Sequence, residues 1–213
     1  MQKLLISTLL LAAVAADNDC TLKCPDDYLS FIRSPTANNL QTSLWCVKPI
    51  FVADPVNVTG GEDLCASEKA VLTTYENDGE RQQILAALKS QLTSLGKTIG
   101  SILVDGHRTA ACDVADRSVL NSAACKDPLK AFEIDDKHTD PTFMLQHWAD
   151  TEPSGTFYNK EVESCLQLSI SAFASRSGGA NDFLCDYAKQ PSNVDSVEFW
   201  NFGALCGKLP HFE

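Results

Sequence analysis

Nine cysteines constrain this chain of 213 residues more than any other feature of its sequence. They stand at positions 20, 24, 46, 65, 112, 125, 165, 185 and 206. In an exported protein this usage indicates a disulfide framework, and the odd count leaves one thiol over. No two cysteines have the CxxC spacing of a zinc site, so we do not expect these thiols to bind metal. The number of cysteines alone leaves the pairing open.

Residues 1–16, MQKLLISTLLLAAVAA, have the pattern of a secretory signal peptide. Lys3 supplies the charged start, and the apolar run from Leu4 to Val14 is far shorter than the ~20 residues that cross a bilayer. No later segment is apolar for long enough to anchor the chain. We therefore expect a secreted protein without membrane insertion. The sequon at Asn57 agrees with this route, although a chance match without a sugar is the alternative.

The chain is acidic, with a formal net charge of −11. This charge argues against a nucleic-acid partner, because phosphate binding depends on Lys and Arg. It fits cation binding, and it fits equally the commoner case of a solvated acidic surface. No repeat, low-complexity tract or linker divides the chain after residue 24, so we expect one domain.

Helical patterns come first along the chain. A first apolar face would consist of Leu64, Ala66 or Ser67, Ala70 and Val71, and a second of Ile84, Leu85, Leu88 and Leu92. The second helix should begin near Asp78 or Gly79. Two helices of about 12 residues each fit these patterns.

Strand-like segments and a long loop follow. The segments TIGSILVDG (98–106), ESCLQLSISAF (163–173) and FGALCGKLP (202–210) predict strands, the first ending in a glycine turn. Between Thr109 and Trp148 lie roughly forty residues with little periodicity, which is typical of a functional loop region. Helices followed by short strands around such a region indicate an α+β fold stapled by disulfides.

Short motifs also occur in a characteristic order. They are CPDDYLSF, LWCVK, CASEKAVL, DGHRTAAC, Trp148 followed by EPS, ESCLQL, ANDFLC and LCGKLP. This order resembles a C-type lectin-like domain, and the variant in secreted nematode proteins is the most similar. The resemblance covers about residues 24–210 and leaves 17–23 as a short N-terminal extension. It implies two helices, small antiparallel sheets and a long loop region.

The resemblance also implies a set of disulfides. The pairs would be Cys24 with Cys46, Cys65 with Cys206, Cys112 with Cys125, and Cys165 with Cys185. Cys20 is then the thiol left over. A disulfide-linked homodimer through Cys20 is one expectation, and a pairing within the N-terminal hairpin or a capped thiol are the others.

A calcium site is the third implication of the resemblance. Calcium-dependent members place Glu-Pro-Asn in one loop, a Glu before the third framework cysteine and Asn-Asp before the fourth. The corresponding residues here, which we expect to bind both Ca²⁺ and sugar hydroxyls, are Glu152, Ser154, Glu163, Asn181 and Asp182. Calcium takes six to eight oxygen ligands, so the carbonyl of Asp182 would add a further ligand and sugar hydroxyls the rest. The family also implies a cis peptide bond before Pro153.

Two departures weaken this expectation. Ser154 stands where the family has Asn, and a hydroxyl is a shorter and weaker ligand without an amide donor. Ala180 stands where a Trp often precedes the Asn-Asp pair. Glu152 before Pro153 leans slightly toward mannose- or glucose-type sugars. The alternative is a calcium-independent domain that recognises a protein, with these loop residues serving as turns.

Catalysis is the rival function from another class. A hydrolase needs a nucleophile or a carboxylate pair beside a base, and the four histidines lie in no recognisable catalytic motif. We therefore expect a binding protein for a glycan or glycoprotein and not an enzyme. Trp148 and Trp200 could stack on sugar rings, although Trp148 more closely matches a core position of the family.

Overall fold

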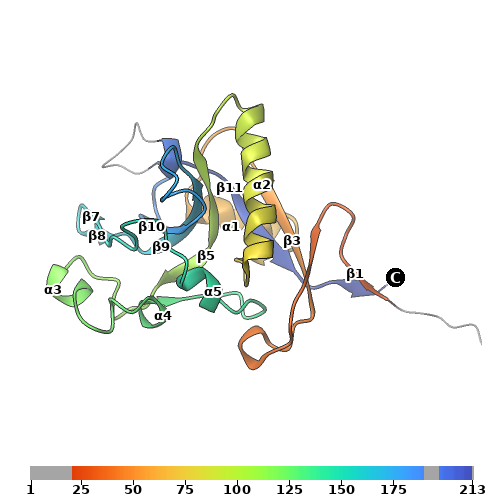
Figure 1. The fold of residues 1–213 in the computed structure, drawn as a ribbon, viewed down its shortest axis with the longest axis horizontal. Coiled ribbons are helices and arrows are strands. Elements are labelled where there is room, and N and C mark those ends of the chain that lie inside the picture. Colours follow the sequence, from red (N-terminus) through yellow and green to blue (C-terminus); the bar gives the residue numbers. More distant parts are fainter. Residues whose placement is uncertain (1–20, 190–196, 213) are drawn as a thin grey trace, which may run out of the picture.

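The computed structural model describes residues 21–189 and 197–212, and a mixed β-sheet forms its centre (Figure 1). The sheet runs β10-β9-β5-β11-β3-β2, with β4 beside β11 and β6 beside β5. The described pairings are antiparallel except that of β5 with β11. The strands are β2 (Leu29–Ile32), β3 (Leu44–Phe51), β4 (Val71–Leu72), β5 (Gly100–Arg108), β6 (Phe132–Glu133), β9 (Cys165–Ile170), β10 (Ala180–Phe183) and β11 (Asn201–Lys208).

Two further pairs of strands form small ribbons outside the sheet. The first joins β1 (Leu22–Lys23) to β12 (His211–Phe212), and it projects from the body of the molecule at the right of Figure 1. The second joins β7 (Phe157–Tyr158) to β8 (Glu161–Val162) and lies at the opposite end. The N- and C-terminal parts of the described chain therefore meet far from the β7–β8 hairpin.

Two helices cover opposite faces of the sheet. Helix α2 (Asp78–Ser94) buries Ile84, Leu88 and Leu92 against one face, and helix α1 (Val58–Ser67) lies on the other. The alternation of side chains along β5 divides the core, with Ile102 and Val104 on the α2 side and Leu103 on the α1 side. Gly61 allows α1 to lie close, because an added Cβ would come 2.5 Å from Leu103 Cδ1.

The second predicted helix is confirmed. It begins at Asp78, where the side chain of Asn77 caps it by accepting the N–H of Glu80 at 3.0 Å. At 17 residues it is longer than the expected 12 or so.

The first predicted helix is only partly correct. It ends at Ser67, and Lys69 then has a φ of 53°. Ala70 and Val71, which the apolar pattern placed on the helix face, lie beyond its end. Val71 and Leu72 instead pair with β11 as strand β4, and a tertiary pairing of this kind leaves no helical signal in the local sequence.

The strand and loop predictions are confirmed with one change. Strands β5, β9 and β11 lie where the patterns placed them, but β5 passes Gly106 and continues to Arg108 through a shift of register. The loop region between Thr109 and Trp148 contains only short elements. These are α3 (Arg117–Leu120), α4 (Pro128–Ala131), β6 and α5 (Thr142–Leu145).

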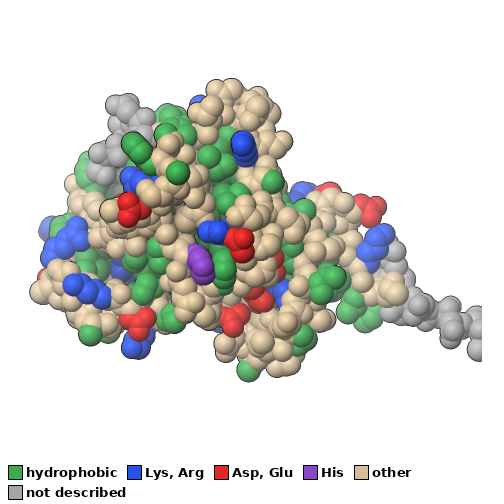
Figure 2. Space-filling model, in the orientation of Figure 1, with side chains coloured by type: hydrophobic (Ala, Val, Ile, Leu, Met, Phe, Trp, Pro, Cys, Tyr) green, Lys and Arg blue, Asp and Glu red, His purple; other side chains and the backbone are tan. Residues whose placement is uncertain are grey.

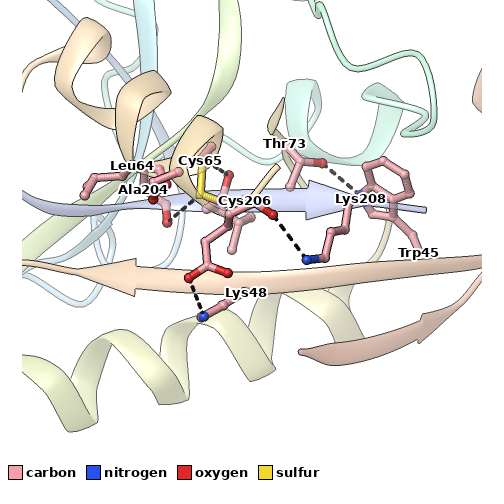
Figure 3. The surroundings of a disulfide bond; sticks show 11 residues. Trp45, Lys48, Leu64, Cys65, Thr73, Ala204, Cys206 and Lys208 are labelled. Carbon is pink, nitrogen blue, oxygen red and sulfur yellow. Dashed lines mark hydrogen bonds and ion pairs between the residues drawn. A yellow bond between two sulfur atoms is a disulfide. The ribbon is translucent and has the colours of Figure 1, made fainter. Parts of the chain in front are cut away.

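The four implied disulfides are all present: Cys24–Cys46, Cys65–Cys206, Cys112–Cys125 and Cys165–Cys185. Figure 3 shows Cys65–Cys206 fixing α1 to β11, with the Trp45 indole directed at the hydroxyl of Thr73. Lys48 and Lys208 bind Glu68 beside the same bridge. The signal peptide at 1–16, Cys20 and the dimer expected through it lie outside the described residues.

A buried arginine ties the N-terminal hairpin to the loop region. The Arg33 guanidinium donates to both carboxylate oxygens of Glu80 at 2.9 and 2.8 Å, and to Thr139 Oγ1 at 2.8 Å. Glu80 belongs to α2 and Thr139 to the loop region. Arg33 therefore joins three parts of the chain through charge-assisted hydrogen bonds.

Candidate ligand-binding site

Three segments of the chain meet at Ser154: its own loop, the residues before β9, and strand β10. The N–H of Ser154 donates to Glu152 Oε2 at 2.8 Å and to Asp182 Oδ1 at 2.9 Å. Its hydroxyl donates to Glu163 Oε2 at 2.6 Å. The structure thus brings together four of the five residues predicted to bind calcium and sugar, and we call Glu152, Ser154, Glu163 and Asp182 the carboxylate cluster.

Two backbone features shape the loop at Ser154. The Glu152–Pro153 peptide bond is cis, as the resemblance implied. Gly155 has a φ of 54°, a conformation that glycine adopts without strain. This turn directs the N–H of Gly155 to Asp182 Oδ2 at 3.0 Å. The backbone of the loop therefore donates two hydrogen bonds to one buried carboxylate.

Asn181 is not among these contacts. Neighbouring residues of a strand face opposite sides of the sheet, and in β10 it is Asp182 that faces the Ser154 loop. The Asn181 side chain is buried, and its amide donates to the carbonyl oxygen of Asp182 at 3.0 Å. That carbonyl is the additional calcium ligand expected from the sequence.

Two arginines lie against the carboxylate cluster. Arg108 Nη2 donates to Asp182 Oδ2 at 2.6 Å, and Arg108 Nε donates to the carbonyl oxygen of Glu163 at 2.7 Å. Arg176 Nη2 donates to Glu152 Oε1 at 3.1 Å. Neither arginine was predicted from the sequence to belong to the site. The usable signal was the place of Arg108 at the end of a buried strand, since an arginine is rarely buried without a partner.

Burial raises the pKa of both glutamates in the cluster. The pKa of Glu152 rises to about 8, first through burial and then through the negative charge of Asp182. The same causes raise the pKa of Glu163 to about 7, against the opposing effect of the hydrogen bond from Ser154. Both carboxyl groups therefore hold a proton more strongly than they would in water.

The cluster does not fit a calcium ion in this arrangement. The two oxygens of Asp182 already accept three donors, and Glu163 Oε2 accepts the Ser154 hydroxyl and the N–H of Thr156. Calcium would need several of these oxygens at 2.3–2.6 Å. Within residues 21–189 and 197–212, no group of three or more His, Cys, Asp or Glu side chains is arranged to hold a metal ion.

Exposed aromatic rings border the cluster. The β7–β8 hairpin connects Ser154 to Glu163, and its Phe157 and Tyr158 are each 39% exposed. The ring of Tyr158 meets Tyr187 edge-on, with 6.1 Å between the ring centres. A hollow of about 290 Å³ beside the hairpin is lined by Asp113, Lys160, Glu161, Val162, Ser164, Cys185 and Asp186. Ring faces and polar groups are therefore available on one surface.

The two tryptophans considered for sugar stacking are packed against the main core. The Trp148 ring lies 5.1 Å from that of Phe132, and its Nε1 donates to the carbonyl oxygen of Leu145, so Trp148 is partly buried at the edge of the core. Trp200 is partly buried against the same core, with Lys189 Nζ 4.1 Å from its ring centre.

Asn57, the residue of the predicted sequon, caps helix α1. Its Oδ1 accepts the N–H of Gly60 at 3.0 Å, and its Nδ2 donates to the carbonyl oxygen of Asp186 at 3.4 Å. A glycosylated asparagine keeps the amide oxygen and one N–H, so a sugar at Asn57 is compatible with the cap. Glycosylation of Asn57 remains a prediction.

The net negative charge is not gathered on the face shown in Figure 2, where acidic and basic side chains are intermixed. Among the described residues, no helix is both long enough and apolar enough to cross a bilayer.

Comparison with known proteins shows the family of this chain. The family model described as C-type lectin domain-containing protein 141/158 matches residues 30–209. C-type lectin domain-containing protein 158 of Caenorhabditis elegans is 44% identical over 212 residues, the full length of both chains. Protein 141 of the same nematode is 35% identical over 202 residues, which are 88% of this chain and 66% of that protein. A solved structure, the Ca²⁺-independent C-type lectin SPL-2 from Saxidomus purpuratus, aligns at a TM-score of 0.49 with 16% identity, over 87% of this chain and 93% of its own. The chain belongs to the C-type lectin domain family.

Proposed function

We propose that this protein is a secreted binding protein whose loop face recognises a glycan or glycoprotein. The observation that carries the proposal is the exposure of Phe157 and Tyr158 on a hairpin whose two ends are fixed to the carboxylate cluster. The ligand surface is thereby presented on a rigid support. Calcium is not part of this proposal, because the carboxylate oxygens already accept donors from the chain.

The chemistry of the surface suits a sugar. Aromatic rings bind the apolar face of a pyranose, and neighbouring polar side chains bind its hydroxyl groups. Tyr158 supplies a ring, and Lys160 and Glu161 supply charged groups at the adjacent hollow. The proposed role is binding without catalysis, since proteins of this family are typically binding proteins.

A glycan array probed with the secreted chain tests the proposal, once in calcium and once in EGTA. We expect binding to the same glycans in both buffers. A Tyr158→Ser variant should bind about tenfold more weakly, which corresponds to ~1.4 kcal/mol. Phe212→Ser is the matched control, since Phe212 is 70% exposed and lies in the terminal ribbon. Equal loss of binding in the two variants would contradict the proposed surface.

Recognition of a protein is the second candidate. Arg117 lies with its guanidinium 5.0 Å from the ring centre of Phe157, and Tyr158 and Tyr187 lie nearby. Tyr, Phe and Arg are enriched in protein interfaces. An array without a bound glycan in either buffer would favour this candidate, whereas binding abolished by EGTA would favour the calcium-dependent lectin predicted from the sequence.

A further inference from the structure

Arg108 lies beside each of the three segments that form the carboxylate cluster. It donates to the side chain of Asp182 in β10 and to the backbone of Glu163 before β9. The third segment passes beside it, since a Cβ added to Gly155 would lie 3.1 Å from Arg108 Nη2. A single cationic group therefore lies where the three segments meet.

The pair of Arg108 with Asp182 is fully enclosed. The Arg108 side chain is 2% exposed and that of Asp182 is 0% exposed. The guanidinium is further fixed by the ring of Phe132, whose centre lies 4.6 Å away. A buried carboxylate requires a partner of opposite charge, and here the chain supplies that partner itself.

Arg176 brings a second guanidinium group to the cluster from the solvent side. It binds Glu152 at 3.1 Å, with 28% of its own side chain exposed. Three carboxyl groups and two guanidinium groups thus share the site. A divalent cation would have to displace Arg108 from Asp182 and break the backbone donors of Ser154 and Gly155.

We infer that Arg108 takes the structural place of the calcium ion, so that the loops of this protein assemble without metal. The guanidinium joins two of the residues that the family resemblance assigned to calcium, through the carboxylate of Asp182 and the backbone carbonyl of Glu163, and it does so with charge-assisted hydrogen bonds in place of coordination. The inference is independent of which ligand the loop face recognises, because it concerns the free protein.

Thermal unfolding of the secreted chain in EGTA and in millimolar calcium chloride tests the inference. We expect the wild-type midpoint to be the same in both buffers. Arg108→Gln should lower the midpoint by roughly 10 °C in EGTA, because it leaves Asp182 buried without its charge partner. Calcium should then raise the midpoint of this variant by several degrees, since the vacated cluster is acidic.

Two further variants serve as controls. Arg117→Gln should behave as wild type, because Arg117 binds the carbonyl oxygen of Ser154 and the ring of Phe157 from the exposed side of the same loop and contacts no carboxylate of the cluster in the described structure. Arg108→Lys keeps the charge, so it should lose less stability than Arg108→Gln and gain no response to calcium. If Arg108→Gln does not fold, the stability of Arg108→Lys in the two buffers still tests the inference.

Three results would overturn the inference. One is a calcium-dependent rise in the wild-type midpoint. The second is an Arg108→Gln variant that is as stable as wild type. The third is a destabilised Arg108→Gln variant without a response to calcium, which would make Arg108 a packing residue and no substitute for a cation.

Discussion

Replacing Asp182 with asparagine should destabilise the loop face without changing its shape. Asparagine has nearly the same volume, but it has one acceptor oxygen where aspartate has two. The three donors that now reach Asp182 are Arg108 Nη2 at 2.6 Å, Ser154 N at 2.9 Å and Gly155 N at 3.0 Å. At least one donor loses its acceptor in Asp182→Asn, and Arg108 becomes a buried charge without its carboxylate.

The magnitude follows from the burial of the pair. Removing one partner of a buried ion pair typically costs about 3–5 kcal/mol, most of it from the charge left behind. For a domain of this size, 1 kcal/mol corresponds to about 2–4 °C, so the midpoint should fall by roughly 6–20 °C. In a double mutant with Arg108→Gln the two losses should be much less than additive, because both remove the same interaction.

Circular dichroism and amide hydrogen exchange measure the two expected effects. The midpoint of Asp182→Asn should fall, and the Ser154 and Gly155 amides should exchange faster while those of the central strands change little. Asp186→Asn is the matched control, since the side chain of Asp186 is exposed and lies four residues after Asp182 in the sequence. A midpoint within 2 °C or so of wild type with unchanged exchange at the two amides would refute the reasoning.

Three further predictions concern other parts of the molecule. Burial raises the pKa of Asp105 to about 7, against about 3.9 in an unfolded chain, so the folded state holds a proton that the unfolded state releases. The contribution of Asp105 to stability should therefore fall by up to ~4 kcal/mol as the pH rises from 4 to 7, in addition to the contributions of Glu152 and Glu163, and in urea unfolding Asp105→Asn should make the slope less steep. Deleting Cys65–Cys206, which closes a loop with a sequence separation of 141, should cost ~4–5 kcal/mol, and an unfolding midpoint equal to wild type would contradict this. Thr59→Ala should remove a sugar from Asn57, seen as a mass loss, without a stability cost from the cap. Asn57→Ala should remove both the sugar and the cap, so it should be ~1 kcal/mol less stable than Thr59→Ala. Equal stability of the two variants would show that the cap is unimportant.

The sequence predicted those parts of the fold that leave a local or family-wide signal. The apolar spacing from Ile84 to Leu92 predicted α2, and the alternation around Leu166 and Leu168 predicted β9. The sequence did not predict strand β4, because its two residues are extended only through pairing with β11. The disulfide pairing came from the resemblance, since the positions of the cysteines alone permit many arrangements.

The sequence predicted the acidic residues of the candidate site but not the basic ones. A family motif identifies Glu152, Glu163 and Asp182 because calcium-dependent relatives keep acids at these positions. The partner of Asp182 comes from the end of β5, 74 residues earlier, and no local pattern links the two. Which cation neutralises a buried acid is a property of the tertiary structure, so the sequence motif alone suggested calcium.

Two buried arginines explain how a loop region with little regular structure keeps a fixed form. Arg33 binds Thr139 in the second half of the region and the carboxylate of Glu80 in α2, and Arg108, directly before the region, is fixed through Asp182 of β10. Apolar burial contributes as well, since α4 and α5 bury Ala131, Met144 and Leu145 in the main core, but these elements are only four residues long. Ion pairs enclosed in this way are sensitive to the loss of either partner, whereas exposed pairs contribute little. The loop region should therefore tolerate changes at its exposed Asp and Lys residues and should lose its order when either arginine is removed.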